Sequence, residues 1–265
     1  MRILFIGDIF GSPGRAIVKD RLPALVKNHK IDLIIANGEN AAAGFGITPA
    51  LAEDLFELGI DVITTGNHVW DKHELVDYFA AENGNPHGQA RRVLRPANYP
   101  PGTAGWGTFQ GTKTGVPYAV MNLQGRIFMG SNDDPFRTAD DLLKQIKAKV
   151  IVVDFHAEAT SEKMAMGWYL DGRATLVVGT HTHVPTADER VLPGGTAYIT
   201  DVGMTGPYES VIGVKKEIVV AKFLNNMPAR FEPAIGDVRL CAVVVDCDES
   251  TGRARNIQRL MLSPA

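Results

Sequence analysis

The chain has 265 residues, of which 45% are hydrophobic and 22% are charged, and its formal net charge is −3. These proportions exclude a disordered or fibrous protein and predict a single domain that spans residues 1–265. The weakly acidic balance gives no general attraction for nucleic acid or for an anionic membrane. The N-terminal apolar run is too short for a signal peptide and no stretch is long enough to span a membrane, so we expect a cytoplasmic protein.

The first part of the chain alternates short apolar runs with helical periodicity, which predicts three consecutive βα units. The expected strands cover residues 2–7, 31–36 and 61–65, and the expected helices cover 15–30, 48–58 and a segment from about residue 71. Thr48 and Pro49 suit the N-cap and the first position of the second helix. Each strand is followed by side chains that can bind metal, namely Asp8, then Glu39 and Asn40, then Asn67.

Residues 84–107 are rich in Gly, Pro, Asn and Arg and show little periodicity. A loop this long in a compact domain is usually functional or involved in assembly, so a substrate lid, a subunit contact and a plain surface loop are equally open interpretations. After this loop we expect a strand over 118–123 and a helix over 134–147, which Asp134 would cap.

The C-terminal half predicts strands over 149–154, 176–178 and 197–200, a helix over 161–170, and a terminal hairpin of strands 240–245 and 257–262. His156 follows the first of these strands, and Gly179-Thr180-His181-Thr182-His183 follows the second. Cys241 and Cys247 would lie about 20 Å apart on one strand, too far to form a disulfide, which fits a reducing compartment.

Six side chains with metal-binding groups therefore follow apolar strands: Asp8, Glu39, Asn67, His156, His181 and His183. The ends of parallel strands gather along one edge of an open sheet, where sites form. Six donors are too many for one tetrahedral zinc ion, but they suit two ions that share a bridging carboxylate, with Mn, Fe or Zn as candidates. Each residue alone also has a structural explanation, such as a helix cap for Asp8, but one two-metal site accounts for all six positions.

These motifs resemble those of the metallophosphoesterase, or calcineurin-like, superfamily. More narrowly, Gly-Asp-Ile-Phe-Gly-Ser-Pro-Gly-Arg, Asn-Gly-Glu-Asn-Ala-Ala and Gly-Asn-His-Val-Trp resemble the YmdB-like bacterial phosphodiesterases. The resemblance implies an α/β fold in which central mixed sheets are flanked by helices in a layered sandwich, here ending in a β-hairpin. Two departures from the superfamily pattern concern the first two motifs. Phe10 stands where a histidine is usual and Glu39 where a bridging aspartate is usual, and we interpret Asn40 as the compensating ligand.

The resemblance also implies a role for each residue. Asp8, Asn40 and His183 would bind one metal, Asn67, His156 and His181 would bind the other, and Glu39 would bridge them. The metals, Fe or Mn with Zn as the alternative, would hold a bridging hydroxide for in-line attack on phosphorus. His68 would protonate the departing oxygen, with Asp71 or Glu74 as its orienting partner, while its structural alternative is packing near Trp70.

The substrate class implied by the resemblance is a small phosphodiester, especially 2′,3′-cyclic AMP, with 3′,5′-cyclic AMP as a second candidate. Two alternatives remain open, a metal-dependent phosphomonoesterase or 5′-nucleotidase and a metal-containing regulatory module that binds a nucleotide; a metal-dependent amide hydrolase fits the motif order less well. The sequence does not decide the oligomeric state, and a homo-oligomer is among the open alternatives. Candidate phosphate contacts are Arg91, Arg92, Arg95 and Arg126, and candidate base-stacking residues are Phe10, Phe45, Tyr99 and Trp168.

Overall fold

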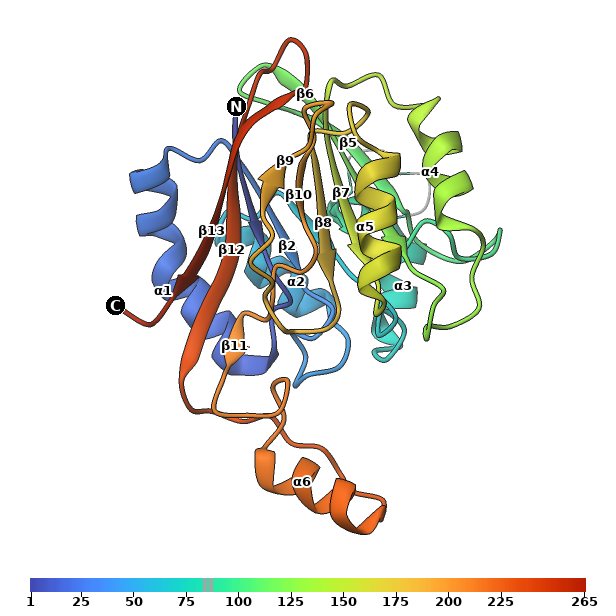
Figure 1. Cartoon of the computed structure of the whole chain (residues 1–265). Helices are drawn as coiled ribbons and strands as arrows, with labels where there is room; N and C mark the ends of the chain where they lie inside the picture. The colour runs from blue at the N-terminus through green and yellow to red at the C-terminus, as the bar shows by residue number, and fades with distance from the viewer. Residues whose placement is uncertain (83–84, 86–87) are drawn as a thin grey trace.

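The computed structural model describes residues 1–82, 85 and 88–265. In these residues the strands form two sheets that lie side by side in Figure 1, with helices on their outer faces. The 7-stranded sheet has the order β11-β12-β1-β2-β3-β4, with β13 paired to β12, and the 6-stranded sheet has the order β5-β6-β7-β8-β10-β9. This layered arrangement confirms the predicted fold class.

The 7-stranded sheet has a parallel centre with an antiparallel side. The parallel strands are β1 (Arg2–Ile6), β2 (Leu33–Asn37), β3 (Val62–Thr64) and β4 (Val93–Leu94). The antiparallel strands are β11 (Gly206–Pro207), β12 (Val238–Cys247) and β13 (Ala254–Leu262). β12 and β13 form the predicted terminal hairpin, in which Cys241 and Cys247 are both free and buried.

The 6-stranded sheet also has a parallel centre. Its parallel strands are β6 (Val116–Gln124), β7 (Val150–His156), β8 (Leu176–Thr180) and β10 (Ala197–Ile199). The antiparallel edge strands are β5 (Thr108–Lys113) and β9 (Arg190–Val191). β1, β2, β7 and β8 are buried along almost their whole length, as expected for strands covered on both faces.

Three apolar layers hold the sandwich together. The layer between the sheets includes Phe5, Leu33, Val120 and Val152. A second layer packs α1 (Gly11–His29), α2 (Pro49–Glu57) and α3 (Glu74–Ala81) on the 7-stranded sheet. The third packs α4 (Pro135–Leu143) and α5 (Thr160–Tyr169) on the 6-stranded sheet. Because the sheets face each other, the carboxyl ends of β1, β2, β3, β7 and β8 are brought to one region of the molecule.

Most predicted elements are present, with shifted ends. Both predicted caps are confirmed, since Thr48 accepts a hydrogen bond from the Leu51 amide and Asp134 accepts from the amides of Phe136 and Arg137. α1 begins at Gly11, earlier than expected, and α3 begins at Glu74, later than expected. The candidate ligands follow strands of two sheets and not one sheet edge, in agreement with the layered sandwich that the resemblance implied.

The long loop has more structure than its composition suggests. Gly84 lies outside the described residues, but the rest includes a 3₁₀ turn at Gln89–Arg92 followed directly by β4. Arg95 donates hydrogen bonds to the carbonyl oxygens of Thr103 and Ala104, which closes this segment on itself.

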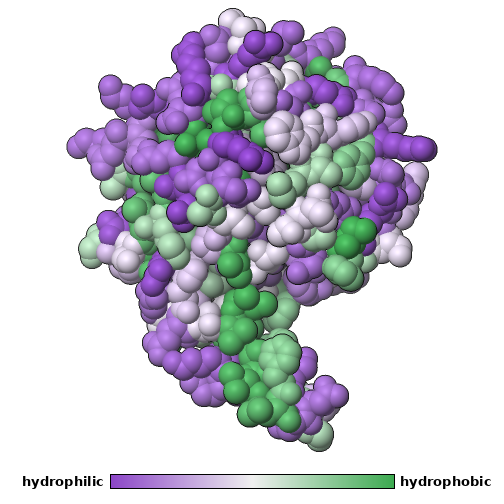
Figure 2. Space-filling view, in the orientation of Figure 1, coloured by the Kyte–Doolittle hydropathy of each residue, from purple (hydrophilic) through white to green (hydrophobic). Residues whose placement is uncertain are grey.

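α6 (Lys216–Asn225) projects from the sandwich on a pair of connecting segments (Figure 1). No element was predicted for residues 202–236. Hydrophobic side chains gather on this projection (Figure 2), and Phe223 and Leu224 are 85% and 83% exposed. None of the helices in the described residues is long and apolar enough to cross a membrane.

Candidate metal centre

The seven predicted metal-binding residues lie at or just beyond the carboxyl ends of five strands. Asp8 follows β1, Glu39 and Asn40 follow β2, and Asn67 follows β3, so these four residues belong to the 7-stranded sheet. The 6-stranded sheet supplies the three histidines. His156 is the last residue of β7, and His181 and His183 follow β8.

The tightest group surrounds the Nε2 atom of His156. This atom lies 3.0 Å from Glu39 Oε1, 3.0 Å from Asn67 Oδ1 and 3.1 Å from His181 Nδ1. One donor atom from each of Glu39, His156 and His181 lies within 4.8 Å of the others. Nitrogen and oxygen donors from both sheets therefore converge on one point.

The remaining predicted residues form a second group beside the first. His183 Nε2 lies 3.2 Å from Asn40 Oδ1, and its Nδ1 lies 2.9 Å from the carbonyl oxygen of Ile212, which can accept the Nδ1 proton. Asp8 Oδ2 accepts a hydrogen bond from the His181 amide at 3.4 Å. Asn40 therefore lies beside His183, and the ring of Phe10 packs edge-on against the same histidine. The interpretation of Asn40 as the compensating ligand stays a prediction.

These donors fit divalent metal ions on two observations. Asp8 Oδ1 is fully buried and has no hydrogen-bond partner among the described residues, an unsatisfied state that a cation would relieve. The donor set mixes imidazole nitrogens with carboxylate and amide oxygens, the combination that suits Mn, Fe and Zn.

The electrostatics of the cluster agree with that fit. Burial opposes ionisation of Glu39, but the adjacent His156, together with His68 and His181, lowers the Glu39 pKa to about 2. Burial, followed by repulsion from His156, lowers the pKa of His181 to about 3. Burial raises the pKa of Asp8 well above its ordinary value. Burial opposes protonation of His156, but the adjacent Glu39 raises the His156 pKa. Glu39 is therefore anionic and His181 neutral, whereas His156 and the Asp8 carboxyl group would each give up a proton when a cation binds.

A cavity of about 450 Å³ opens above the cluster, and Glu39, Asn40, His68, His181 and His183 line it. Phe10, Phe45, Ile212, Val214 and Phe231 form its apolar part. Among the described residues that line this cavity, none is Lys or Arg. An anionic ligand here would face Glu39 and Glu158 with no fixed positive side chain, so bound cations would have to supply the attraction.

His68 lies at the wall of the cavity, on the segment that follows β3. Its Nδ1 atom is 2.8 Å from Asp71 Oδ2, so of the two predicted orienting partners Asp71 makes the contact. Its ring packs edge-on against Phe45 with centroids 5.1 Å apart, whereas Trp70 packs against Phe79 and Tyr99. The Asp71 contact leaves His68 Nε2 as the ring nitrogen that can act in the cavity.

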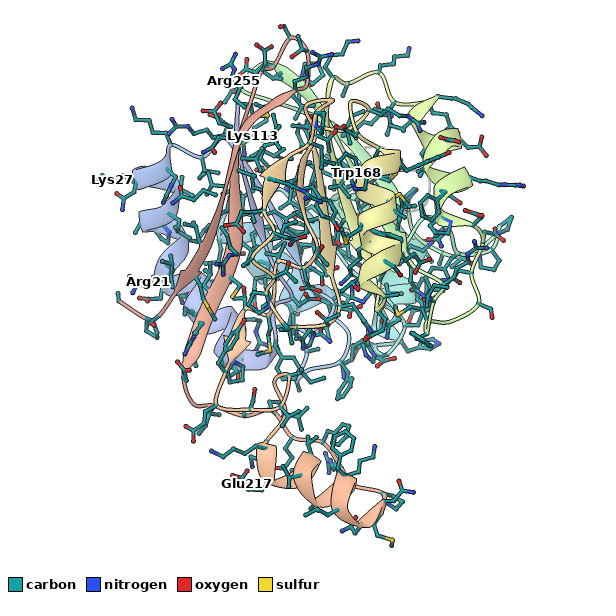
Figure 3. All side chains as sticks on the ribbon, in the orientation of Figure 1. Arg21, Lys27, Lys113, Trp168, Glu217 and Arg255 are labelled. Carbon is teal, nitrogen blue, oxygen red and sulfur yellow. The ribbon has the colours of Figure 1, made fainter. Side chains whose placement is uncertain are left out.

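Several residues that the sequence suggested as phosphate or base contacts interact with other side chains instead. Arg91 stacks on Trp106 and Arg92 on Phe56, and Arg126 pairs with Asp134. Trp168 lies on α5 (Figure 3), and the centre of its ring is 5.6 Å from Arg190 Cζ.

Of the candidate base-stacking residues, only Phe10 and Phe45 are among the described residues that line the cavity. No described residue of the 84–107 loop lines the cavity either, which gives its interpretation as a lid no support.

Sequence reasoning missed the buried ion pair that supports the histidine loop. Lys163 Nζ lies 2.7 Å from Asp201 Oδ2, and both side chains are 1% exposed. The same carboxylate oxygen accepts hydrogen bonds from the amide and the hydroxyl group of Thr182. His181 and His183 adopt positive φ angles of 102° and 66°, a conformation that non-glycine residues adopt only when their surroundings hold them there.

Glu158 was also missed. Its Oε2 lies 3.1 Å from His181 Nε2 and it lines the cavity. Its position two residues after His156 was the available signal in the sequence.

A model of the YmdB-like protein family matches residues 4–260 of this chain. The chain belongs to the YmdB-like family. A relative from Bacillus subtilis, described as a 2′,3′-cyclic-nucleotide 2′-phosphodiesterase, is 49% identical over 99% of this chain and 97% of its own length. The crystal structure of a protein from Mycoplasma pneumoniae, described as a novel phosphatase, is 33% identical, covers 100% of this chain and 94% of its own, and has a TM-score of 0.91.

The fold extends beyond the YmdB-like family. The crystal structure of a 5′-nucleotidase precursor from Thermus thermophilus matches with a TM-score of 0.61 at 13% identity and covers 100% of this chain but 54% of its own. At that identity the likeness shows a shared fold and carries no assignment of substrate. The predicted metallophosphoesterase-type layered fold and the predicted family are therefore both confirmed.

Proposed function

We propose that this chain is a two-metal phosphodiesterase that hydrolyses 2′,3′-cyclic nucleotides. The observation that carries the proposal is the convergence of Glu39, His156 and His181 donor atoms within 4.8 Å, below a cavity whose described lining has no Lys or Arg. The 49% identical Bacillus subtilis relative, named for this activity over nearly its whole length, supports the substrate class. A cavity of about 450 Å³ is in the size range of small-molecule sites.

In this proposal Asp8, Asn40 and His183 would hold one metal ion, Asn67, His156 and His181 would hold the other, and both ions would share Glu39. Fe or Mn fits the mixed donor set, and Zn is the alternative. When bound, two such ions lower the pKa of a water molecule that attacks phosphorus and neutralise charge on the phosphoryl oxygens.

His68 provides the proton for the leaving group. Asp71 accepts the Nδ1 proton of His68, which orients the ring so that Nε2 faces the cavity and can pass a proton to the departing oxygen. For a 2′,3′-cyclic nucleotide we expect the P–O2′ bond to break as water adds to phosphorus. A proton moves from His68 to O2′, the proton that the attacking water loses restores His68 through the solvent, and the product is the nucleoside 3′-phosphate.

The apolar part of the cavity suits a nucleobase. Phe45 and Phe231 line the cavity, and Phe45 contacts the ring of His68. A base stacked on this side would place its ribose phosphate toward the cluster, because the metal-binding side chains form the polar part. 3′,5′-cyclic AMP presents the same groups and is a second substrate to test.

The test is turnover of 2′,3′-cyclic AMP, 3′,5′-cyclic AMP and 5′-AMP by Mn²⁺-loaded protein, with products identified by chromatography. We expect 2′,3′-cyclic AMP to be hydrolysed fastest and to yield 3′-AMP. His68→Ala should lower kcat about 10²–10⁴-fold at unchanged metal content. His73→Ala, an exposed histidine on the same segment, is the matched control and should retain full activity. Faster turnover of 5′-AMP than of either diester would contradict the proposal and favour the phosphomonoesterase.

A further inference from the structure

Next to the cluster, in the interior between the two sheets, lies a carboxylate outside the predicted metal-binding set, that of Asp154. Asp154, on β7, is fully buried. Its Oδ2 accepts hydrogen bonds from Asn37 Nδ2 at 2.9 Å and from Thr64 Oγ1 at 2.5 Å, and its Oδ1 accepts from Thr180 Oγ1 at 2.7 Å. A carboxylate with donors from both sheets holds a fixed orientation.

Thr180 links this carboxylate to the metal-binding cluster. Its Oγ1 atom also lies 2.9 Å from His156 Nδ1. A hydroxyl group has one proton to donate, and Asp154 Oδ1 accepts it, so the Thr180 oxygen is left to accept a proton from the imidazole. With a metal ion bound, His156 would then keep its one proton on Nδ1 and present the Nε2 lone pair to the site, where Glu39, Asn67 and His181 converge.

The Asp154 carboxylate also orients a side chain of the 7-stranded sheet, that of Asn37. Because Asn37 donates its amide group to Asp154, its Oδ1 atom is turned toward the backbone of the following loop. There it accepts a hydrogen bond from the Glu39 amide at 3.1 Å. One buried carboxylate therefore positions His156 of one sheet and the backbone of Glu39 of the other.

We infer that Asp154 and Thr180 are positioning residues that fix His156 as the Nδ1–H tautomer and so direct Nε2 toward the metal. This inference rests on the metal site of the proposed function. Hydrogen-bonded groups behind a metal-binding histidine fix its tautomer, and changing them typically lowers metal affinity about 10–100-fold.

The hydrogen-bonded chain from Asp154 through Thr180 to His156 is called the relay below. Two substitutions should break it in different ways. In Asp154→Asn the amide oxygen would face the Asn37 and Thr64 donors and the NH₂ group would face Thr180. The Thr180 proton would then turn to His156 Nδ1 and place the imidazole proton on Nε2. An aspartate-to-asparagine change behind the histidine of a serine protease has this effect on the tautomer. Thr180→Val removes the oxygen that accepts the His156 Nδ1 proton. It keeps the shape of the side chain and the charge of Asp154.

The test is the Zn²⁺ affinity of chelator-treated protein, measured by competition with a chromophoric chelator. Asp154→Asn and Thr180→Val should each bind Zn²⁺ about 10–100-fold more weakly than the wild type. Thr180→Ser restores the hydroxyl group and should bind like the wild type. Thr64→Val is the matched control, because it removes one buried hydrogen bond to Asp154 Oδ2 while Asn37 still holds that oxygen and Thr180 still joins Oδ1 to His156. It should also bind like the wild type.

A spectroscopic readout separates the relay from a general packing effect. In Zn²⁺-loaded protein with ¹⁵N-labelled histidine, the His156 Nδ1 proton should give a downfield, slowly exchanging signal in the wild type and in Thr180→Ser. The signal should be lost in Thr180→Val. His156→Gln assigns it.

Two results would overturn the inference while leaving the metal site standing. One is equal Zn²⁺ affinity and an unchanged signal in Thr180→Val, and the other is a loss of affinity in Thr64→Val as large as that in Thr180→Val. Failure of the wild type to bind Zn²⁺ at all would instead overturn the proposed metal site, and this inference with it.

Discussion

The two sheets contribute different chemistry to the candidate site. The 7-stranded sheet supplies oxygen donors from Asp8, Glu39, Asn40 and Asn67, whereas the 6-stranded sheet supplies imidazole nitrogens from three histidines. The histidine side is held from behind, by Thr180 at His156 and by the Ile212 carbonyl oxygen at His183. On the oxygen side Asp8 Oδ1 is buried without a partner among the described residues.

This difference shows what each sheet does. The histidine side is built by the fold, because its side chains already have hydrogen-bond partners that fix their orientation. The oxygen side carries the negative charge and, in the proposed function, would be completed by cations. Metal ions at this position would therefore join the two sheets as well as activate a substrate, and the following predictions test that division.

The largest expected effect is on the support of the histidine side. Lys163→Met removes the partner of Asp201 and leaves a buried carboxylate unpaired, so we expect the free energy of unfolding to fall by about 3–5 kcal/mol. Urea denaturation measures this change. Lys144→Met removes an exposed pair with Asp141 and should leave the urea midpoint almost unchanged. Equal effects in the two variants would mean that the buried pair does not stabilise the fold.

Glu39 tests the oxygen side. Glu39→Gln keeps the shape but removes the charge next to His156, and we expect hydrolysis of 2′,3′-cyclic AMP to fall by at least about 100-fold, with loss of bound metal. Activity and metal content should be measured on the same sample. Glu158→Gln is the matched control, since this carboxylate lies on the histidine side at 47% side-chain exposure and should matter less. A Glu39→Gln variant with full metal content and activity would show that Glu39 does not bind metal.

Metal addition tests whether the two sides are joined. Ions that bind only the folded chain raise its stability by about 2.7 kcal/mol at a free concentration 100 times Kd. Thermal unfolding of chelator-treated protein with added Mn²⁺ should show a higher midpoint, which excess chelator reverses. His181→Gln should show a smaller rise. An unchanged midpoint in the wild type, at Mn²⁺ concentrations that support turnover, would argue against metals that join the sheets.

The smallest effect is expected away from both sides, on α6. Phe223 is 85% exposed, so Phe223→Ser should change the free energy of unfolding by less than about 0.5 kcal/mol and leave turnover unchanged. Urea denaturation at two protein concentrations measures it. A large, concentration-dependent loss would show that another copy of the chain covers this face in solution.

The sequence was most informative where the signal is local. Each strand that carries a candidate ligand was recognised from a short apolar run followed by polar residues, and the caps at Thr48 and Asp134 were recognised from residue type. The motif order also indicated the correct family. The metal-binding roles themselves stay predictions, although the structure places their side chains together.

What the sequence did not show depends on contacts between distant segments. The resemblance implied a layered sandwich of sheets, but which strand joins which sheet follows from packing across Phe5, Leu33 and Val152, which no local period encodes. Lys163 looks like an ordinary helical lysine until Asp201, 38 residues later, is placed beside it. Asp154 was predicted as the last residue of its strand, and only the tertiary structure shows that it lies inside β7 with buried partners from both sheets.

The most direct test of the central claim is a Mn²⁺ titration of chelator-treated protein, with hydrolysis of 2′,3′-cyclic AMP followed at each step. If the two sheets hold a two-metal site that performs the reaction, metal-free protein is inactive and activity rises to a plateau at two Mn²⁺ ions per chain. Full turnover by metal-free protein, or a plateau at one ion per chain, would contradict it.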